Sequence, residues 1–194
     1  MPEGFSAHGV VVLAAGASTR LGRPKQLLRY RDETLVHRAA RLALETRPRD
    51  AVIVLGFDAD SVFSHVAELS LRRVDCIDWR RGLGASLRAG VDALSPLCAG
   101  VLVMLCDQPK LEAPHLLALC DAWSAAPDRG IASFYANRFG APALLPRAWF
   151  DALDAESDRG MRDLLARRVG HIDAIANENL ADDIDLPQDL RLLS

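Results

Sequence analysis

Short apolar runs alternate with amphipathic segments over the first two thirds of the chain. The valine-rich run at residues 10–13 stops at Ala14-Ala15-Gly16, which predicts a buried strand followed by a tight turn. Further strands are predicted at 51–55, 73–77 and 101–105. Helices are predicted at 59–69, 86–94 and 113–123, and another helix is capped by Thr34 and ends at Arg47-Pro48. This alternation is typical of a parallel sheet with helices on both faces.

The pattern changes after Arg129. A strand pair is predicted at 131–135 and 141–145, helices near Trp149 and at 161–168, and a last strand at 171–176. Because no internal repeat and no long linker divides the sequence, we expect one domain over residues 1–194. The expected fold class is α/β, a three-layer Rossmann-like arrangement with a mostly parallel sheet between two layers of helices.

The composition argues against several classes of function. The 194 residues carry a formal net charge of −3 with scattered arginines, so we expect neither nucleic acid nor an anionic membrane as a partner. No apolar run approaches the ~20 residues of a membrane helix, and the opening residues lack the features of a signal peptide. The four cysteines show no CxxC spacing. We therefore expect reduced thiols and a cytoplasmic location.

The loop after the first predicted strand could bind an anion. Gly16 and Gly22 allow sharp turns that bring backbone N–H groups against phosphate oxygens. Ser18 adds a hydroxyl donor, and Arg20 and Lys25 add positive charge. The spacing matches neither the Walker A loop nor the dinucleotide fingerprint, which argues against an NAD-dependent dehydrogenase. The residues alone leave an ordinary strand–helix turn with exposed basic side chains equally open.

An acidic residue, Asp107, follows directly on the most apolar run of the chain. Ligands of open parallel sheets lie beyond the carboxyl ends of the strands, so Asp107 and the glycine-rich loop are expected at one edge. A carboxylate there could hold Mg²⁺ together with substrate phosphates, or it could simply cap a turn. The acidic stretch 182–189 could likewise cap a terminal helix that begins at Pro187. It becomes a metal candidate only if Asp185 faces Asp107.

Six short motifs occur in a fixed order along the chain. They are L-A-A-G-A-S-T-R-L-G-R-P-K at 13–25, G-L-G-A-S-L at 82–87, C-D-Q-P at 106–109, G-A-P at 140–142, D-R-G-M-R at 158–162 and D-I-D-L-P-Q-D at 183–189. Any one of them is a weak signal, but the ordered set is specific. The set resembles the molybdenum cofactor nucleotidyltransferases, whose fold is of the nucleotide-diphospho-sugar transferase type.

The resemblance implies a role for each matching residue. A nucleoside triphosphate would be held by nine residues: Leu13, Ala14, Ala15, Gly16, Ser18, Gly22, Lys25, Gly82 and Ser86. Lys25, Arg20 and Asp107 would be catalytic, and Asp107 and Asp185 would bind Mg²⁺. Two such carboxylates repel each other when no cation is present, so metal and nucleotide are expected to bind cooperatively.

Within the family, the motifs are most similar to the cytidylyl branch. Ala15 stands where the guanylyl branch usually has glycine, and Pro24-Lys25-Gln26 also resembles the cytidylyl sequences. The resemblance implies transfer of CMP from CTP to the terminal phosphate of molybdopterin cofactor, with a molybdenum hydroxylase apo-enzyme as a further partner. The alternatives are GTP in place of CTP, a sugar or polyol phosphate as acceptor, and a non-catalytic carrier of the cofactor.

Overall fold

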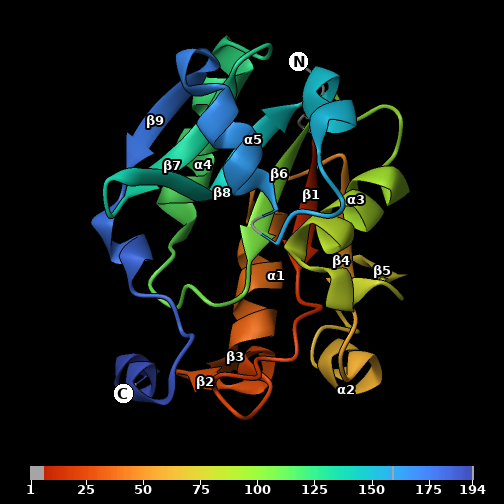
Figure 1. The fold of residues 1–194 in the computed structure, drawn as a ribbon, viewed down its shortest axis with the longest axis vertical. Helices are drawn as coiled ribbons and strands as arrows, with labels where there is room; N and C mark the ends of the chain where they lie inside the picture. The colour runs from red at the N-terminus through yellow and green to blue at the C-terminus, as the bar shows by residue number, and fades with distance from the viewer. Residues whose placement is uncertain (1–6, 159, 194) are drawn as a thin grey trace.

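The computed structural model describes residues 7–158 and 160–193. Residues 1–6, on which the expectation about a signal peptide partly rests, and Arg159 of the fifth motif lie outside them. Seven strands form one sheet in the order β5-β4-β1-β6-β8-β7-β9 (Figure 1). Their bounds are β1 His8–Leu13, β4 Asp50–Leu55, β5 Arg72–Asp75, β6 Gly100–Leu105, β7 Gly130–Tyr135, β8 Arg138–Pro146 and β9 Ile172–Ala176. In the described chain, β8 runs antiparallel to both neighbours and the other pairings of this sheet are parallel.

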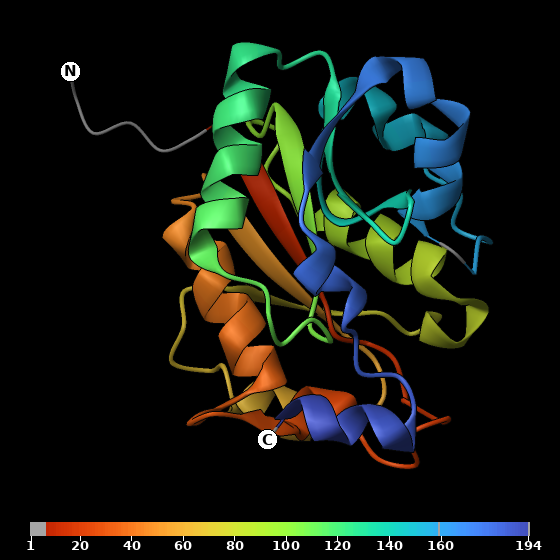
Figure 2. The same cartoon turned by 90° about the vertical axis from the view of Figure 1, so that its left-hand side faces the viewer.

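Helices cover both faces of the sheet (Figure 2). Helices α1 (Leu35–Glu45), α2 (Ala59–Ser64) and α4 (Ala113–Ala125) lie on one face, and α3 (Leu83–Ala93) and α5 (Met161–Arg167) lie on the other. Side chains alternate along β1, so Val10 and Val12 pack under the first layer and Val11 and Leu13 under the second. Because both faces are buried, residues 10–13 of β1 are all apolar and do not alternate with polar residues. The predicted three-layer α/β fold is confirmed.

Several boundaries differ from the prediction. Helix α2 ends at Ser64, and α3 begins at Leu83 because the glycine-rich turn is itself the start of the helix. The terminal helix is a 3-10 helix, Pro187–Leu193. The structure also has a hairpin of β2 (Arg29–Tyr30) and β3 (Glu33–Thr34), whose strands are too short to show an alternation of apolar and polar residues in the sequence. Further 3-10 turns lie at Lys25–Leu27, Trp79–Arg81, Arg147–Ala152, Val169–His171 and Glu178–Ala181.

The buried guanidinium of Arg38 ties α1 to the segment that follows β6. Its Nε and Nη2 donate to the carbonyls of Pro109 and Leu111 at 2.9 and 2.8 Å. Its Nη1 donates to Glu33, which also accepts from Arg41. A planar donor group with several fixed partners holds loop backbone better than a single contact would. The segment that follows β6 and carries Asp107 is therefore held against helix α1.

The Glu33 carboxylate makes stability depend on pH. Hydrogen bonds from Arg41, and then from His37 and Arg38, lower the pKa of Glu33 from 4.5 to about 2, against the opposing effect of burial. A carboxyl group whose pKa is lower in the folded than in the unfolded protein stabilises the fold at pH values above the unfolded pKa. This stabilisation is lost as the pH falls from 4.5 to 2. We expect Glu33→Gln to lower the unfolding free energy by up to about 3 kcal/mol at pH 7 and by much less near pH 2.

Urea melts of both proteins across this range measure the effect. Glu45→Gln is the matched control, because Glu45 makes a more exposed pair with the same Arg41. A Glu33→Gln effect that stays constant from pH 7 to pH 2 would contradict the prediction.

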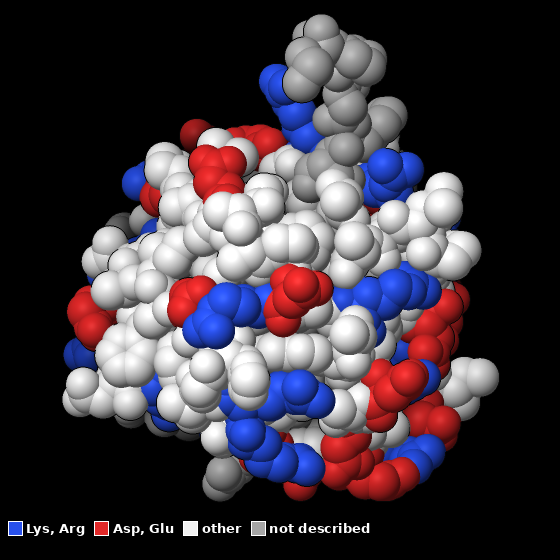
Figure 3. Space-filling view, turned by 90° about the horizontal axis from the view of Figure 1, so that it is seen from above, with Lys and Arg blue, Asp and Glu red and all other residues white. Residues whose placement is uncertain are grey.

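On the face seen from above, basic and acidic side chains are interspersed (Figure 3). Among the described residues, no helix is both long and apolar enough to cross a membrane.

Candidate active site

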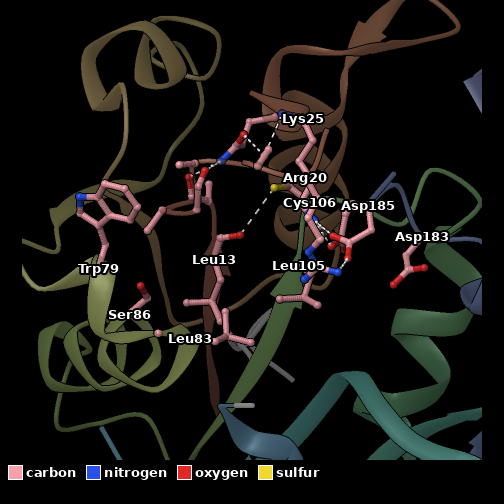
Figure 4. Close-up of a pocket in the computed structure, with 18 of the residues that line it drawn as sticks. Leu13, Arg20, Lys25, Trp79, Leu83, Ser86, Leu105, Cys106, Asp183 and Asp185 are labelled. Atoms are coloured by element: carbon pink, nitrogen blue, oxygen red, sulfur yellow. Dashed lines mark hydrogen bonds and ion pairs between the residues drawn. The ribbon is translucent and has the colours of Figure 1, made fainter. Parts of the chain in front are cut away.

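A pocket of about 980 Å³ opens at the carboxyl ends of β1 and β6 (Figure 4). Eleven of the predicted site residues line it: Leu13, Ala14, Ala15, Gly16, Ser18, Arg20, Lys25, Gly82, Ser86, Asp107 and Asp185. Trp79, Leu83 and Ser86 lie on one side of the pocket, and Lys25, Asp183 and Asp185 lie on the other. The pocket thus has one side with an aromatic ring and one side rich in charge.

Gln26 shapes the loop after β1, a role that its place in Pro24-Lys25-Gln26 did not reveal. Its side chain is buried, and its Nε2 donates to the carbonyls of Ala14 and Gly16 at 2.9 and 2.6 Å. The Ser18 hydroxyl accepts the backbone N–H of Lys25 at 3.1 Å. These bonds close the loop on itself, so the loop keeps its shape without a ligand.

The two glycines of this loop have different surroundings. Gly22 has a φ of +77° and its N–H donates to the Ser18 carbonyl, so it serves the turn and does not line the pocket. Gly16 lines the pocket, and a methyl group on it would meet no atom within 4 Å. Open space at Gly16 lets a ligand approach the backbone, as phosphate-binding loops require.

Lys25 lies at the centre of a charged network. Its Nζ is 2.7 Å from Asp107 Oδ2 and 3.1 Å from Asp185 Oδ1, and the second oxygen of Asp185 is 2.6 Å from Arg20. The Lys25 and Asp107 side chains are only 17% and 12% exposed. Burial disfavours the ammonium charge, but Asp107 and Asp185 outweigh it, so the pKa of Lys25 lies above its ordinary value. The predicted repulsion between Asp107 and Asp185 in the absence of a bound metal ion is wrong, because the Lys25 ammonium lies between the two carboxylates and offsets their charge.

Asp185 reaches Asp107 through the residue before it. Ile184 is fully buried against Leu21 and Leu35, and its N–H donates to the Asp107 carbonyl at 2.9 Å. Among the described residues, no acid before Pro187 accepts a backbone N–H of the terminal 3-10 helix. Its own Asp189 accepts the N–H groups of residues 185 and 186, and these bonds lower the pKa of Asp189.

The acidic side of the pocket fits a divalent cation. Within the described part of the chain, Asp107 Oδ1 is buried and has no hydrogen-bond partner, which leaves a hard oxygen ligand free. Asp183, across Ile184 from Asp185, is half-buried, and its pKa is raised by burial and by the charges of Asp107 and Asp185. Among the described residues, no three such side chains are already arranged around a metal position. Lys25 fills that space and would have to move for the three carboxylates to converge.

Three further residues, Gln108, Trp79 and Cys106, also line the pocket. Gln108 is buried, and its Nε2 lies 3.3 Å from the Tyr135 hydroxyl and 2.9 Å from the Ala141 carbonyl. It therefore joins the end of β6 to the β7–β8 hairpin. Trp79 lies on the side of the pocket opposite the carboxylates. Burial raises the pKa of Cys106 to about 12, so this thiol is neutral near pH 7 and has a packing role.

The arrangement is suited to a polyanionic ligand. It offers a glycine loop and, on its charged side, a lysine and an arginine beside hard carboxylate ligands. Among the described residues that line the pocket there is no histidine, and its thiol is neutral. Chemistry that proceeds by positioning and charge neutralisation fits this site better than nucleophilic or general-base catalysis.

Comparison with known proteins agrees with this chemistry. Residues 10–172 match the family described as the MobA-like NTP transferase domain. The chain is 35% identical to the nicotine blue oxidoreductase of Paenarthrobacter nicotinovorans, over 94% of this chain and 95% of that protein.

Solved structures of other proteins share the fold of this chain. Rv0371c of Mycobacterium tuberculosis H37Rv superposes with a TM-score of 0.84 at 30% identity, over 98% of each chain. A manganese complex of Rv0371c superposes with a TM-score of 0.75 at 28% identity, over 95% of this chain and 96% of that one. A CMP:2-keto-3-deoxy-manno-octonic acid synthetase complexed with CTP, at 12% identity, shares the fold alone, with a TM-score of 0.74 over 95% and 96% of the two chains.

The sheet order and these neighbours confirm a fold of the nucleotide-diphospho-sugar transferase type. With a family match that spans most of its length, this chain belongs to the MobA-like NTP transferase family and is a nucleotidyltransferase.

Proposed function

We propose that the protein transfers CMP from CTP to the terminal phosphate of molybdopterin cofactor, which yields molybdopterin cytosine dinucleotide and pyrophosphate. The observation that carries this proposal is the Lys25 ammonium between Asp107 and Asp185, beside an open glycine loop. The six ordered motifs and the family match support the molybdenum cofactor as acceptor. A molybdenum hydroxylase apo-enzyme is the proposed recipient of the product.

In this proposal the residues act mainly by binding and orienting. The loop from Leu13 to Gly22 holds the triphosphate, with Gly82 and Ser86 at the start of α3 facing the nucleoside. Lys25 and Arg20 turn from their carboxylate partners to the phosphates and neutralise the charge that develops on the leaving pyrophosphate. The acceptor phosphate is already ionised near neutral pH, so no protein group has to remove a proton.

Asp107, Asp185 and Asp183 are the proposed ligands of Mg²⁺. Bound there, Mg²⁺ would neutralise oxygens of the α-phosphate and the leaving group. The free Oδ1 of Asp107 and the hard oxygen donors support this assignment. In the structure, the charge of Lys25 offsets the charge of these carboxylates. When Lys25 turns to the triphosphate, it frees the carboxylates for Mg²⁺, so the metal and the triphosphate should bind cooperatively.

Nucleotide choice gives a direct test. Ala15 is almost fully buried at the pocket wall, and its carbonyl accepts the N–H of Phe57 at 3.0 Å, so its methyl group has a fixed position. A pocket closed by this methyl admits the single ring of cytosine more readily than the double ring of guanine. We expect CTP to bind at least about tenfold tighter than GTP in calorimetry with Mg²⁺, and Ala15→Gly to narrow the ratio. Equal or tighter binding of GTP would overturn the choice of CTP.

The deciding experiment is mass spectrometry of the products after incubation with CTP, Mg²⁺ and molybdopterin cofactor. A product heavier by one CMP, with one pyrophosphate released, supports the proposal. A carrier would bind the cofactor without pyrophosphate release, and a panel of sugar and polyol phosphates tests the other acceptors.

One comparison favours a second candidate activity. The Paenarthrobacter relative is named an oxidoreductase, and it aligns along nearly its whole length. The same preparation is therefore to be incubated with NADH or NADPH and nicotine blue. Oxidation of the reduced nucleotide, without pyrophosphate release under any condition above, would favour that activity over the transfer reaction.

A further inference from the structure

A second pocket adjoins the active site. It has a volume of about 550 Å³ and is lined by residues of the β7–β8 hairpin and of helix α5. Arg138 and Arg162 belong to the walls of both pockets, so they mark the junction between them. A volume of this size suits a small organic ligand.

Among the described residues, the two arginines at the junction have no acidic partner. Arg138 follows the hairpin tip Ala136-Asn137, where both residues have positive φ, and Arg162 lies in the first turn of α5. Within the described chain, neither guanidinium forms a hydrogen bond or an ion pair, whereas Arg129, nearby in the sequence, is held by Asp173. Unpaired guanidinium groups at a pocket junction are well suited to bind a phosphate.

Tyr135 connects this junction to the acidic side of the active site. The positive charges of Arg162 and Arg138 act on its hydroxyl, and so do the negative charges of Asp107 and Asp183. The hydroxyl has room there because Gly140 has no side chain, and a methyl group at Gly140 would overlap it. An anion on the two arginines would therefore lie close to the carboxylates proposed to bind the metal.

The outer part of the second pocket is apolar. The rings of Phe134 and Phe139 pack edge to face with centroids 5.5 Å apart, and Leu165 and the half-exposed Val169 lie beside them. Asp163 is the acid among the described lining residues, and it accepts a hydrogen bond from Ser157 at 2.8 Å. Such a wall suits a ligand with a flat or apolar body.

We propose that this second pocket is the acceptor subsite, in which Arg138 and Arg162 bind the acceptor's phosphate and the apolar wall receives its ring. This inference rests on the proposed nucleotidyl transfer and names the acceptor class, a phosphate monoester that carries a flat ring system. An oxygen of that phosphate forms a bond to the α-phosphorus of the triphosphate. The bond from that phosphorus to the bridging oxygen breaks, and pyrophosphate leaves with the electron pair.

The test uses phenyl phosphate as the probe and a triphosphate whose α,β-bridging oxygen is a methylene group, so that the glycine loop is filled and no transfer occurs. Binding is measured by calorimetry and by ligand-observed NMR, with Mg²⁺ present. We expect Arg138→Met/Arg162→Met to weaken phenyl phosphate binding at least about tenfold, the effect of losing charge-assisted hydrogen bonds. Arg167→Met is the matched control, because Arg167 lies on the same helix but lines neither pocket.

Two comparisons make the outcome decisive. Phenyl phosphate should bind the wild-type protein more tightly than inorganic phosphate, because only the ester reaches the apolar wall. No binding of the ester to the wild-type protein, or equal binding to the double variant, would overturn the subsite. If the arginines prove necessary for ester binding but CTP and molybdopterin cofactor yield no pyrophosphate, the subsite stands and the proposed function falls.

Discussion

Lys25→Ala is expected to lower turnover by about 10²-fold or more, the effect of removing a preorganised donor to the leaving group. In the ligand-free protein, the Lys25 ammonium is bonded to Asp107 and Asp185 with little exposure to solvent. Its loss leaves these carboxylates without their shared cation. We therefore expect a loss of stability on the order of 1–3 kcal/mol, which leaves a domain of ordinary stability folded, so that the lost turnover does not come from unfolding.

The same variant should change metal binding in the opposite direction. Because Lys25 no longer fills the space between the carboxylates, Mn²⁺ should bind more tightly to Lys25→Ala than to the wild-type protein when no nucleotide is present. Electron paramagnetic resonance of free Mn²⁺ measures this. Lys110→Ala is the matched control, since Lys110 pairs with Asp182 on a neighbouring loop and does not line the pocket. Near wild-type turnover in folded Lys25→Ala protein would exclude the proposed role.

Asp107→Asn is expected to reduce Mg²⁺-dependent turnover by about 10²-fold or more while the fold persists. The change keeps the size of the side chain but removes the charge of a group that already has one unpartnered oxygen, Oδ1. Thermal melting should show a much smaller stabilisation by Mg²⁺ with CTP than the wild-type protein shows. The variant should not be more stable than the wild type without metal, because Lys25 loses a bonding partner.

Asp185→Asn should have the same effect more weakly, since Asp185 is more exposed than Asp107 and also pairs with Arg20. Asp182→Asn serves as the control from the same acidic stretch, because Asp182 pairs with Lys110 and does not line the pocket. Full Mg²⁺-dependent turnover in Asp107→Asn would remove Asp107 from the site, and the carboxylate model with it.

The sequence by itself determined the layers of the fold and one half of the site. Valine-rich runs with helical segments between them leave a parallel sheet as the arrangement that buries both faces, because the runs at 10–13, 51–55 and 101–105 are apolar throughout. The carboxyl ends of such strands meet at one edge, so the glycine loop and Asp107 could be expected together. These features depend on local periodicity and on one general rule of sheet topology.

Only the tertiary structure decided the other half. Asp183 and Asp185 reach Asp107 because Ile184 is buried under the N-terminal segment and bonds the Asp107 carbonyl, a contact across 77 residues (184 − 107) that no periodicity reveals. The hydrogen bonds that the side chains of Gln26, Gln108 and Arg38 donate to backbone carbonyls likewise depend on which carbonyls lie nearby in the folded chain. The antiparallel pairing of β8 with β6 also joins distant segments. Long-range hydrogen bonds of this kind leave no mark in the local spacing of residues, which is why the sequence could name residues that line the pocket but not how they are joined.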